Sequence, residues 1–200
     1  MKKVIVIGGA GTIGKVVTAR LKEDHEVIVA GRNSGDIRVD IADSQSIEAM
    51  FREVGEVDAV VNVSGEAKWD HFDNLSEEDF YIGIRSKLMG QVNLVRIAKE
   101  YLNQGGSVTL TTGILADDPV LMTTSAAMVN GAIHSFVKAV VLDRPDIRVN
   151  AVSAGLVADA YEKYKSYFPG HDPVPMEKVA NGYIKCVDGQ ITGQVVRVMA

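Results

Sequence analysis

Hydrophobic and polar positions along the chain switch repeatedly between two patterns. Short runs of β-branched residues, such as KVIVI at residues 3–7, are typical of strands that are covered on both faces. Longer segments repeat apolar residues every three or four positions, as in residues 12–23, and this spacing predicts helices. The predicted strands are residues 3–7, 26–31, 37–40, 58–63, 106–112, 147–153 and 193–199. The predicted helices are residues 12–23, 44–54, 76–102, 120–142 and 176–187.

The alternation of strands and helices predicts one α/β domain over residues 1–200. Because crossovers between parallel strands are right-handed, we expect a three-layer α/β/α sandwich whose parallel sheet has the order 3-2-1-4-5-6-7. Residues 32–36 are too few for a helix, so a bare loop should join the second and third strands. Residues 156–175, which include three prolines, are predicted to be irregular.

Several short polar residues stand where a helix should begin. Asp43 or Ser44 is expected to cap the helix over 44–54. Ser76, followed three positions later by Asp79, has the spacing of a capping box. Ser125 is expected to act as the N-cap of the helix over 120–142 rather than as a nucleophile, because no base is placed to activate it.

The composition narrows the class of protein. Twenty-one basic and 26 acidic residues give a net charge of -5, which argues against a nucleic-acid footprint or a basic membrane-binding face. The single cysteine, Cys186, excludes an internal disulfide and is expected to be buried. The apolar run after Lys3 is too short for a secretory signal, and no later segment reaches the roughly 20 apolar residues of a membrane span. A cytoplasmic protein is therefore expected.

Glycines follow the first strand at the spacing of a phosphate-binding loop. Gly8 can form the tight turn, Gly11 lets backbone approach a diphosphate, and Gly14 lets helix and strand pack closely. The start of the next helix then offers free N–H groups to the anion, with Thr12 and Ile13 beside it. The pattern predicts a Rossmann-like dinucleotide site rather than a plain turn.

The end of the second strand indicates which dinucleotide is bound. Gly31 stands where a carboxylate would bind a free ribose hydroxyl, and Arg32, Asn33 and Ser34 follow it. Arg32 can bind a 2′-phosphate through its guanidinium, so NADP is favoured over NAD. Asp36 is expected to lie past the adenosine. The other interpretation of Arg32 is a solvated arginine in a turn.

Five segments in order resemble the short-chain dehydrogenase/reductase family over nearly the whole chain. They are GGAGTIG (8–14), VDIAD (39–43), VVNVSG (60–65), IRVNAVSAGLV (147–157) and QITGQVVRV (190–198). The resemblance implies that Asp40 and Ile41 hold the adenine and that Val63, Ser64 and Gly65 line the cofactor site. It also implies a reductase or dehydrogenase that exchanges hydride between NADP(H) and a carbonyl or alcohol.

The chain departs from this family at the positions that carry its chemistry. The family uses a serine, a tyrosine with a lysine four residues later, and an asparagine on the preceding long helix; its tyrosine donates a proton to the carbonyl. The resemblance places Ala126 at the tyrosine, Asn130 at the lysine, Gly113 at the serine and Lys87 at the asparagine. No Tyr-x-x-x-Lys occurs between residues 105 and 150. The catalytic residues are therefore unknown from the sequence.

Several polar side chains could substitute. Lys87 could bind ribose or polarise a carbonyl, or simply reach solvent. Thr111 or Thr112 could orient a substrate oxygen, although strand-end threonines often bond backbone, and His134 is expected to be a packed helix histidine. Three tyrosines could bring a phenol to the site: Tyr161, Tyr164 and Tyr167. Without a neighbouring lysine, the pKa of such a phenol is expected to stay near 10.

Two functions remain open at this stage. One is an NADP-dependent oxidoreductase with a non-standard active site, and the other is a non-catalytic NADP(H)-binding regulator or sensor. No metal site is expected because the histidines are scattered; they are His25, His71, His134 and His171. Small and apolar residues on more than one face of the two long helices predict a homodimer or homotetramer.

Overall fold

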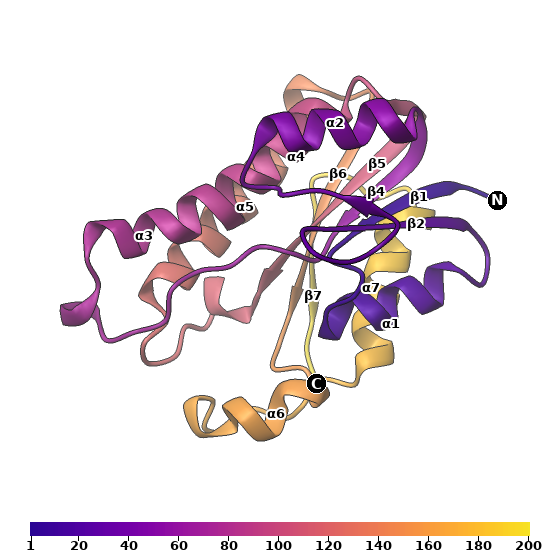
Figure 1. Cartoon of the computed structure of the whole chain (residues 1–200). Helices are drawn as coiled ribbons and strands as arrows, with labels where there is room; N and C mark the ends of the chain where they lie inside the picture. Colours follow the sequence, from indigo (N-terminus) through magenta and orange to yellow (C-terminus); the bar gives the residue numbers. More distant parts are fainter.

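A computed structural model describes residues 1–200 as a three-layer sandwich around one parallel sheet (Figure 1). The strand order is β3-β2-β1-β4-β5-β6-β7, and every pair of neighbouring strands is parallel, as predicted. The strands are β1 (Lys3–Ile7), β2 (Glu26–Gly31), β3 (Ile37–Arg38), β4 (Val57–Asn62), β5 (Leu102–Gly113), β6 (Arg148–Ala154) and β7 (Val195–Val198).

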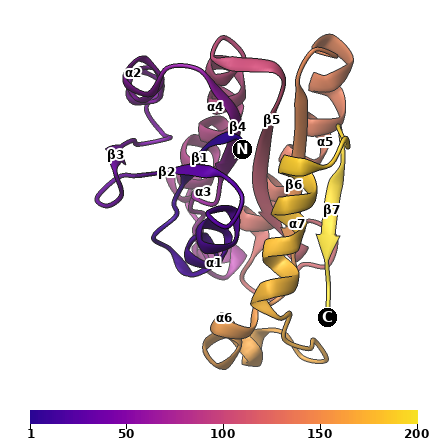
Figure 2. The ribbon, with the colours of Figure 1, turned by 90° about the vertical axis from the view of Figure 1, so that its right-hand side faces the viewer.

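Helices cover both faces of the sheet. On one face α1 (Thr12–Leu21) and α7 (Met176–Asp188) lie side by side (Figure 2), where Leu21 and Tyr183 are buried against the sheet. On the other face lie α2 (Ser44–Val54), α4 (Gly90–Ala98) and α5 (Thr124–Asp143), which bury Ile47, Leu94 and Ile133 in a second core. Burial on both faces explains why the central strands are continuous apolar runs.

The connection from β2 to β3 is a loop without a helix, as predicted, but β3 is shorter than expected. Only Ile37 and Arg38 pair with β2, whereas residues 37–40 were predicted. The Val39 N–H still donates to the Gly31 carbonyl of β2 at 3.2 Å, whereas the Asp40 N–H donates to Ser46 Oγ at 2.9 Å instead of to the sheet.

The predicted long helix over 76–102 is present but shorter, with helical residues running without a break from Glu77 to Ala98. The segment consists of α3 (Glu77–Gly83), a π-helical segment (Ile84–Met89) and α4, and β5 begins at Leu102 rather than at 106. A π-helical turn shifts the facing of the side chains that follow it, but it leaves the composition of the segment that of a helix, so the sequence pattern predicts only a helix. Such turns occur frequently at functional sites.

Two further expectations need correction. The segment 156–175 contains α6 (Ala158–Tyr164) and a 3₁₀ turn (Lys165–Tyr167), because aromatic side chains on one side of this segment pack on Trp69 and Leu156. Ser125 is not an N-cap: α5 begins after Thr123, and the Ser125 hydroxyl is buried in the first turn without a partner.

The other expected caps are present. The Asp43 carboxylate accepts a hydrogen bond from the Gln45 N–H at 2.9 Å and caps α2. Ser76 and Asp79 form a capping box at α3. Cys186 is buried, as expected.

One helix meets the length and composition of a membrane span. It is α5, whose mean hydropathy is 1.4 over the most apolar window, so the expectation that no segment does so is wrong. In this fold the inner face of α5 packs in the core, and its buried residues include Val129, Ile133 and Val137.

Candidate functional site

Two cavities lie at the carboxyl ends of the strands and meet at Gly65. This edge of a doubly wound sheet, where the strand order reverses between β1 and β4, is the usual place for a ligand. The first cavity has a volume of about 320 Å³. Its lining comes from the ends of β1, β2 and β4 and from the residues after β3: Ile7, Gly8, Ala10, Gly11, Gly31, Arg32, Asn33, Ser34, Val39, Asp40, Ile41, Val63, Ser64 and Gly65.

The glycine loop has the geometry that a diphosphate needs. Gly8 has a φ of +81°, and a Cβ at Gly14 would lie 2.1 Å from the Gly8 carbonyl oxygen. Both positions therefore require glycine. The N-cap residue of α1 is Gly11, which has no side chain to occupy the free N–H groups of the first turn. These groups remain available to an anion, so the loop fits a dinucleotide.

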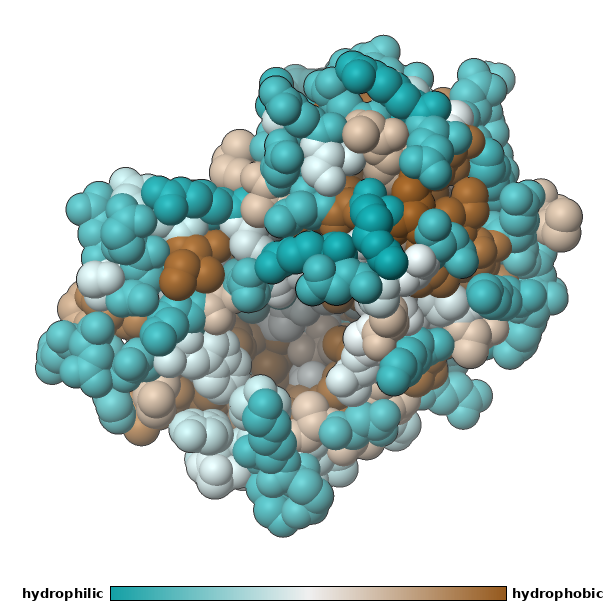
Figure 3. Space-filling model, in the orientation of Figure 1, coloured by the Kyte–Doolittle hydropathy of each residue, from teal (hydrophilic) through white to brown (hydrophobic).

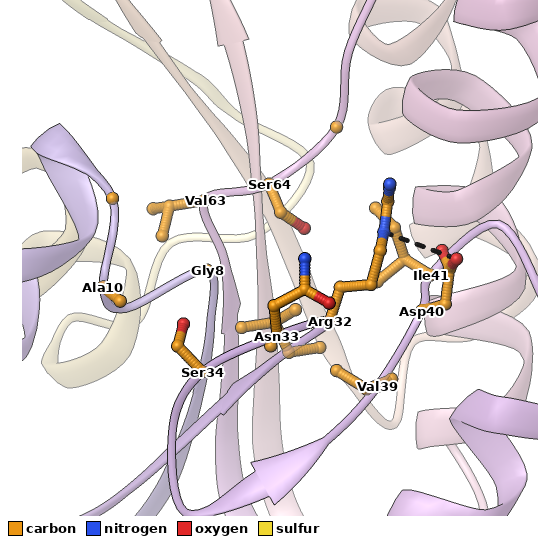
Figure 4. A pocket seen from close by; sticks show the side chains of 14 residues that line it. Gly8, Ala10, Arg32, Asn33, Ser34, Val39, Asp40, Ile41, Val63 and Ser64 are labelled. Atoms are coloured by element: carbon orange, nitrogen blue, oxygen red, sulfur yellow. Dashed lines mark ion pairs between the residues drawn. The ribbon is translucent and has the colours of Figure 1, made fainter.

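Arg32 and Asn33 project into the first cavity beside Asp40 (Figure 4). The Arg32 guanidinium is 3.4 Å from the Asp40 carboxylate and 3.5 Å from that of Glu66. Arg32 is thus paired with two carboxylates and lines the cavity, although its side chain is exposed. Asp36 turns away from the cavity, because its carboxylate accepts a hydrogen bond from the Val29 N–H at 2.9 Å.

The structure brings most of the predicted cofactor residues together. Thr12 and Ile13 line the second cavity instead of the first, and Gly14 lies under the loop and lines neither. The other ten predicted residues line the first cavity: Gly8, Gly11, Arg32, Asn33, Ser34, Asp40, Ile41, Val63, Ser64 and Gly65. Ile7, Ala10 and Val39 were missed, although each adjoins a residue that was predicted.

The second cavity is larger and mostly apolar, with a volume of about 560 Å³. In the orientation of Figure 1 the face between α1, α3 and α6 is hollowed, and pale and brown side chains surround the hollow (Figure 3). Its lining is Thr12, Ile13, Gly65, Trp69, Lys87, Thr112, Gly113, Ile114, Leu115, Ala154, Gly155, Leu156, Val157, Ala160, Tyr164 and Phe168. Lys87 is the only charged side chain among them.

Lys87 belongs to the π-helical segment and faces this cavity. Its ammonium has no ion-pair partner, and burial lowers its pKa from 10.5 to about 8. The backbone carbonyl of Lys87 accepts a hydrogen bond from Gln91 Nε2 at 3.1 Å. Gly65 allows the close approach, since a Cβ there would lie 3.1 Å from the Lys87 Cα. Lys87 therefore does not simply reach solvent.

A buried amide network holds this region together. Gln91 is fully buried, and its Oε1 accepts from Asn62 Nδ2 at 3.1 Å and from the Thr111 N–H at 2.8 Å. Its Nε2 also donates to the Thr111 carbonyl at 3.1 Å. Asn62 Oδ1 in turn accepts from the Ser64 hydroxyl at 2.7 Å, which orients the cavity wall. Sequence reasoning missed Gln91, because nothing local marks a glutamine as a buried link.

The positions at which the resemblance places the family's catalytic serine, tyrosine and lysine lie near the second cavity. Gly113 lines it, and a Cβ there would lie 3.8 Å from the Asn130 side-chain nitrogen. Asn130 is buried, and its Oδ1 has no hydrogen-bond partner. Ala126 is buried in a small apolar cluster with Leu115 and Phe168.

The two threonines at the end of β5 have different surroundings. Thr111 points into the core, where its hydroxyl donates to the Asn62 carbonyl and lies 2.7 Å from the Tyr183 hydroxyl. Thr112 lines the second cavity, and its hydroxyl is 2.8 Å from His134 Nε2. Burial lowers the pKa of His134, so the packed neutral histidine that was expected is the form this site favours.

Aromatic side chains form one end of the second cavity. The Trp69 ring lies 5.6 Å from that of Tyr164 and 6.5 Å from that of Phe168, measured between centroids. A third cavity of about 430 Å³ adjoins it and shares Trp69 and Tyr164 with it. The expectation that no lysine neighbours these tyrosines is wrong, because the Lys163 ammonium lies 4.8 Å from the Tyr164 ring centroid.

Two of the histidines pair with single carboxylates outside the two cavities. His25 Nε2 lies 3.1 Å from Asp188, and His171 Nε2 lies 3.3 Å from Asp118. No group of three or more His, Cys, Asp or Glu side chains could hold a metal ion.

Comparisons with known proteins agree with this architecture. A family model described as enoyl-(acyl carrier protein) reductase matches residues 9–173. A short chain dehydrogenase of Claviceps purpurea is 32% identical over 76% of this chain, and the match spans 61% of that protein's length. The hydroxynaphthalene reductase-like protein Arp2 of Metarhizium acridum is 28% identical over 90% of this chain and 79% of its own length.

Two solved structures are similar over almost the whole chain. The protein lin1944 from Listeria innocua is 43% identical, with a TM-score of 0.97 over 99% of this chain and 100% of that one. A small-chain dehydrogenase solved in complex with NADPH is 28% identical, with a TM-score of 0.87 over 98% and 96% of the two chains. Matches of this extent, on the sheet order and glycine loop described above, show that the chain belongs to the short-chain dehydrogenase/reductase family of oxidoreductases.

Proposed function

We propose that the protein is an NADP(H)-dependent oxidoreductase that interconverts a bulky apolar carbonyl compound and its alcohol in a non-standard active site. The observation that carries this proposal is the junction of the two cavities at Gly65. One cavity combines a free helix N-terminus with Arg32, and the other combines an apolar lining with one amine. A dinucleotide that lies across the junction would bring its nicotinamide beside Lys87.

NADP is the favoured cofactor because of the charges around the ribose end of the first cavity. Arg32 can form charge-assisted hydrogen bonds with a 2′-phosphate. Gly31 stands at the end of β2, where an acidic side chain would repel that phosphate. The related small-chain dehydrogenase solved with NADPH supports this choice. Glu66 and Asp40 compete for the same guanidinium and limit the preference, because both carboxylates lie within 3.5 Å of it.

The active site is non-standard in this proposal because small or amide residues replace the family's catalytic set. Ala126 offers no hydroxyl, and Asn130 offers no cation. The cofactor, when bound, supplies or accepts hydride. The residues of this chain exclude water from the apolar cavity, orient the carbonyl through Thr112, and present Lys87 to it.

A flat, aromatic substrate fits the lining of the second cavity best. Trp69, Tyr164 and Phe168 offer ring faces and edges on which such a substrate can stack. The names of two relatives, a hydroxynaphthalene reductase-like protein and a versicolorin reductase, agree with this class, since the first names a fused aromatic compound.

The test combines binding with turnover. Calorimetric titration with NADPH and NADH should give a lower Kd for NADPH, and a panel of aryl ketones screened by loss of nicotinamide absorbance should contain a substrate. Aliphatic ketones of similar size serve as the control for the aromatic cavity and should react more slowly. Tight NADPH binding with no turnover of any carbonyl would contradict the enzyme and favour a cofactor-binding regulator or sensor instead.

A further inference from the structure

We propose that Lys87 donates the proton to the carbonyl oxygen during reduction, in the role that the family gives to its tyrosine. This inference rests on the proposed function and adds the identity of the acid. Within the second cavity Lys87 is the only charged side chain, and Tyr164 is the only other titratable one. The carbonyl of a substrate that enters this cavity has few polar groups to meet besides Lys87 and Thr112.

The ammonium of Lys87 is available for a substrate because nothing in the chain engages it. It forms no ion pair, and its pKa responds only to burial. The titratable groups on neighbouring segments are held elsewhere: Glu66 by Arg32, Glu78 by Arg85, and His134 by Thr112. Lys68, on the loop that contains Glu66, is exposed.

The backbone around Lys87 is fixed, so its position does not depend on the substrate. Gln91 binds the Lys87 carbonyl, Ser86 Oγ accepts from the Glu66 N–H at 3.2 Å, and Gly65 packs on the Lys87 Cα. The rigid part of the segment is therefore the main chain, while the four-carbon side chain can follow a reacting oxygen. A group held in this way can act as a general acid.

Reduction of the carbonyl transfers one hydride and one proton to the substrate. The carbonyl carbon accepts hydride from NADPH, and the carbonyl oxygen accepts a proton from the Lys87 ammonium. The products are the alcohol, NADP⁺ and a neutral amine, which regains a proton from water. A pKa of about 8 keeps most of the amine protonated near neutral pH and makes it a better proton donor than an ordinary lysine.

The experiment compares three variants with the natural protein. Lys87→Met removes the acid, Lys87→Arg keeps the charge but holds its proton, and Lys178→Met is the control, since Lys178 is an exposed lysine on α7. For an aryl ketone, kcat/KM should fall about 10²–10⁴-fold in both Lys87 variants and not in the control. The Kd for NADPH, measured by calorimetry, should change less than about threefold.

The pH dependence of kcat/KM distinguishes a proton-donating role of Lys87 from a role in packing alone. In the natural protein kcat/KM for reduction should decline as the pH rises through about 8, because the acid loses its proton. The residual rate of Lys87→Met should lack that decline. If Lys87→Arg were as active as the natural protein, charge alone would suffice and the proposal would be overturned.

Thermal unfolding gives a readout that needs no substrate. Burial of the charged amine destabilises the folded state fully below about pH 8, and this penalty disappears as the pH approaches the unfolded pKa of about 10.4. Lys87→Met should therefore unfold at a Tm higher by at least about 3 °C near neutral pH. The difference should narrow at about pH 10.

The outcomes distinguish this inference from the proposed function. If the natural protein binds NADPH but reduces no carbonyl, the proposed function fails first. If it reduces an aryl ketone and Lys87→Met keeps both the rate and the pH profile, only the role of Lys87 is overturned. The role is also overturned if Lys87→Met loses NADPH binding in proportion to its rate, because Lys87 would then hold the cofactor.

Discussion

In the function proposed here, Arg32 sets the preference for NADPH, in competition with two carboxylates of the same chain. Each pair, with Asp40 at 3.4 Å and Glu66 at 3.5 Å, joins exposed side chains and contributes at most about 1 kcal/mol. Hydrogen bonds between charged partners contribute about 1.5–3 kcal/mol. A 2′-phosphate should therefore displace both carboxylates from Arg32, and part of the binding free energy of its own hydrogen bonds should remain as a preference for NADPH over NADH.

Arg32→Ala should weaken NADPH binding about 10- to 100-fold and leave NADH binding almost unchanged, because only the 2′ substituent differs. Arg38→Ala is the matched control, since Arg38 lines neither cavity. Glu66→Gln should strengthen NADPH binding up to about fivefold by releasing Arg32. Calorimetry on all four proteins measures these changes, and equal affinities for NADPH and NADH in the natural protein would contradict the assignment.

For single residues, the sequence predicts ten of the residues that line the first cavity, but it does not reveal contacts between distant parts of the chain. Gly8 and Gly11 lie in the loop after β1, and Arg32 directly follows β2, so each is marked by its place at the end of a strand. The pairing of Arg32 with Glu66 and the contact of Gln91 with Thr111 join residues far apart in the chain. Such pairs depend on the finished fold, and no local pattern signals them.

The π-helical segment between α3 and α4 is the element that shapes the active site. It contains Lys87, which lines the second cavity, and the Gln91 side chain donates to the Lys87 carbonyl. The apolar periodicity of residues 76–102 predicts only a helix, because the extra residue of a π turn changes the facing of side chains and not their composition.

Gln91→Met should lower the free energy of unfolding by about 2–5 kcal/mol, since it removes the side-chain partner of the buried Thr111 N–H and carbonyl. It should also lower kcat more than it changes the Kd for NADPH, because Lys87 loses its fixed backbone. Urea denaturation measures the first effect. Gln45→Met, an exposed change on α2, is the control, and equal unfolding free energies for both variants would refute the structural role of Gln91.

The outer face of α5 supports the proposed homo-oligomer. Met128 is 44% exposed, and a Cβ at Gly131 would meet nothing within 4 Å in this chain. Gly131→Arg should therefore fold normally but block the close approach of a second subunit, giving monomers by light scattering where the natural protein is a dimer or tetramer. Monomers of the natural protein at micromolar concentration would contradict the proposal.

The whole molecule is a sheet with two adjoining cavities on its carboxyl edge, and the sheet is the part that could be predicted. Strand order follows from the alternation of elements and the right-handed crossover, and the structure confirms it. The aromatic end of the second cavity could not be predicted, since α6 and Trp69 lie about ninety positions apart in the chain and meet only in the fold.

The most direct test of the account is transfer of deuterium from labelled cofactor to substrate. NADPH would be prepared with deuterium in place of either hydrogen at C4 of the nicotinamide, and each form would be incubated with the protein and a fused-ring aryl ketone. We predict that one of the two forms gives an alcohol that carries a single deuterium on the carbinol carbon, detected by mass spectrometry. NADPH that binds tightly while neither form yields deuterated alcohol from any ketone of the panel would contradict the account.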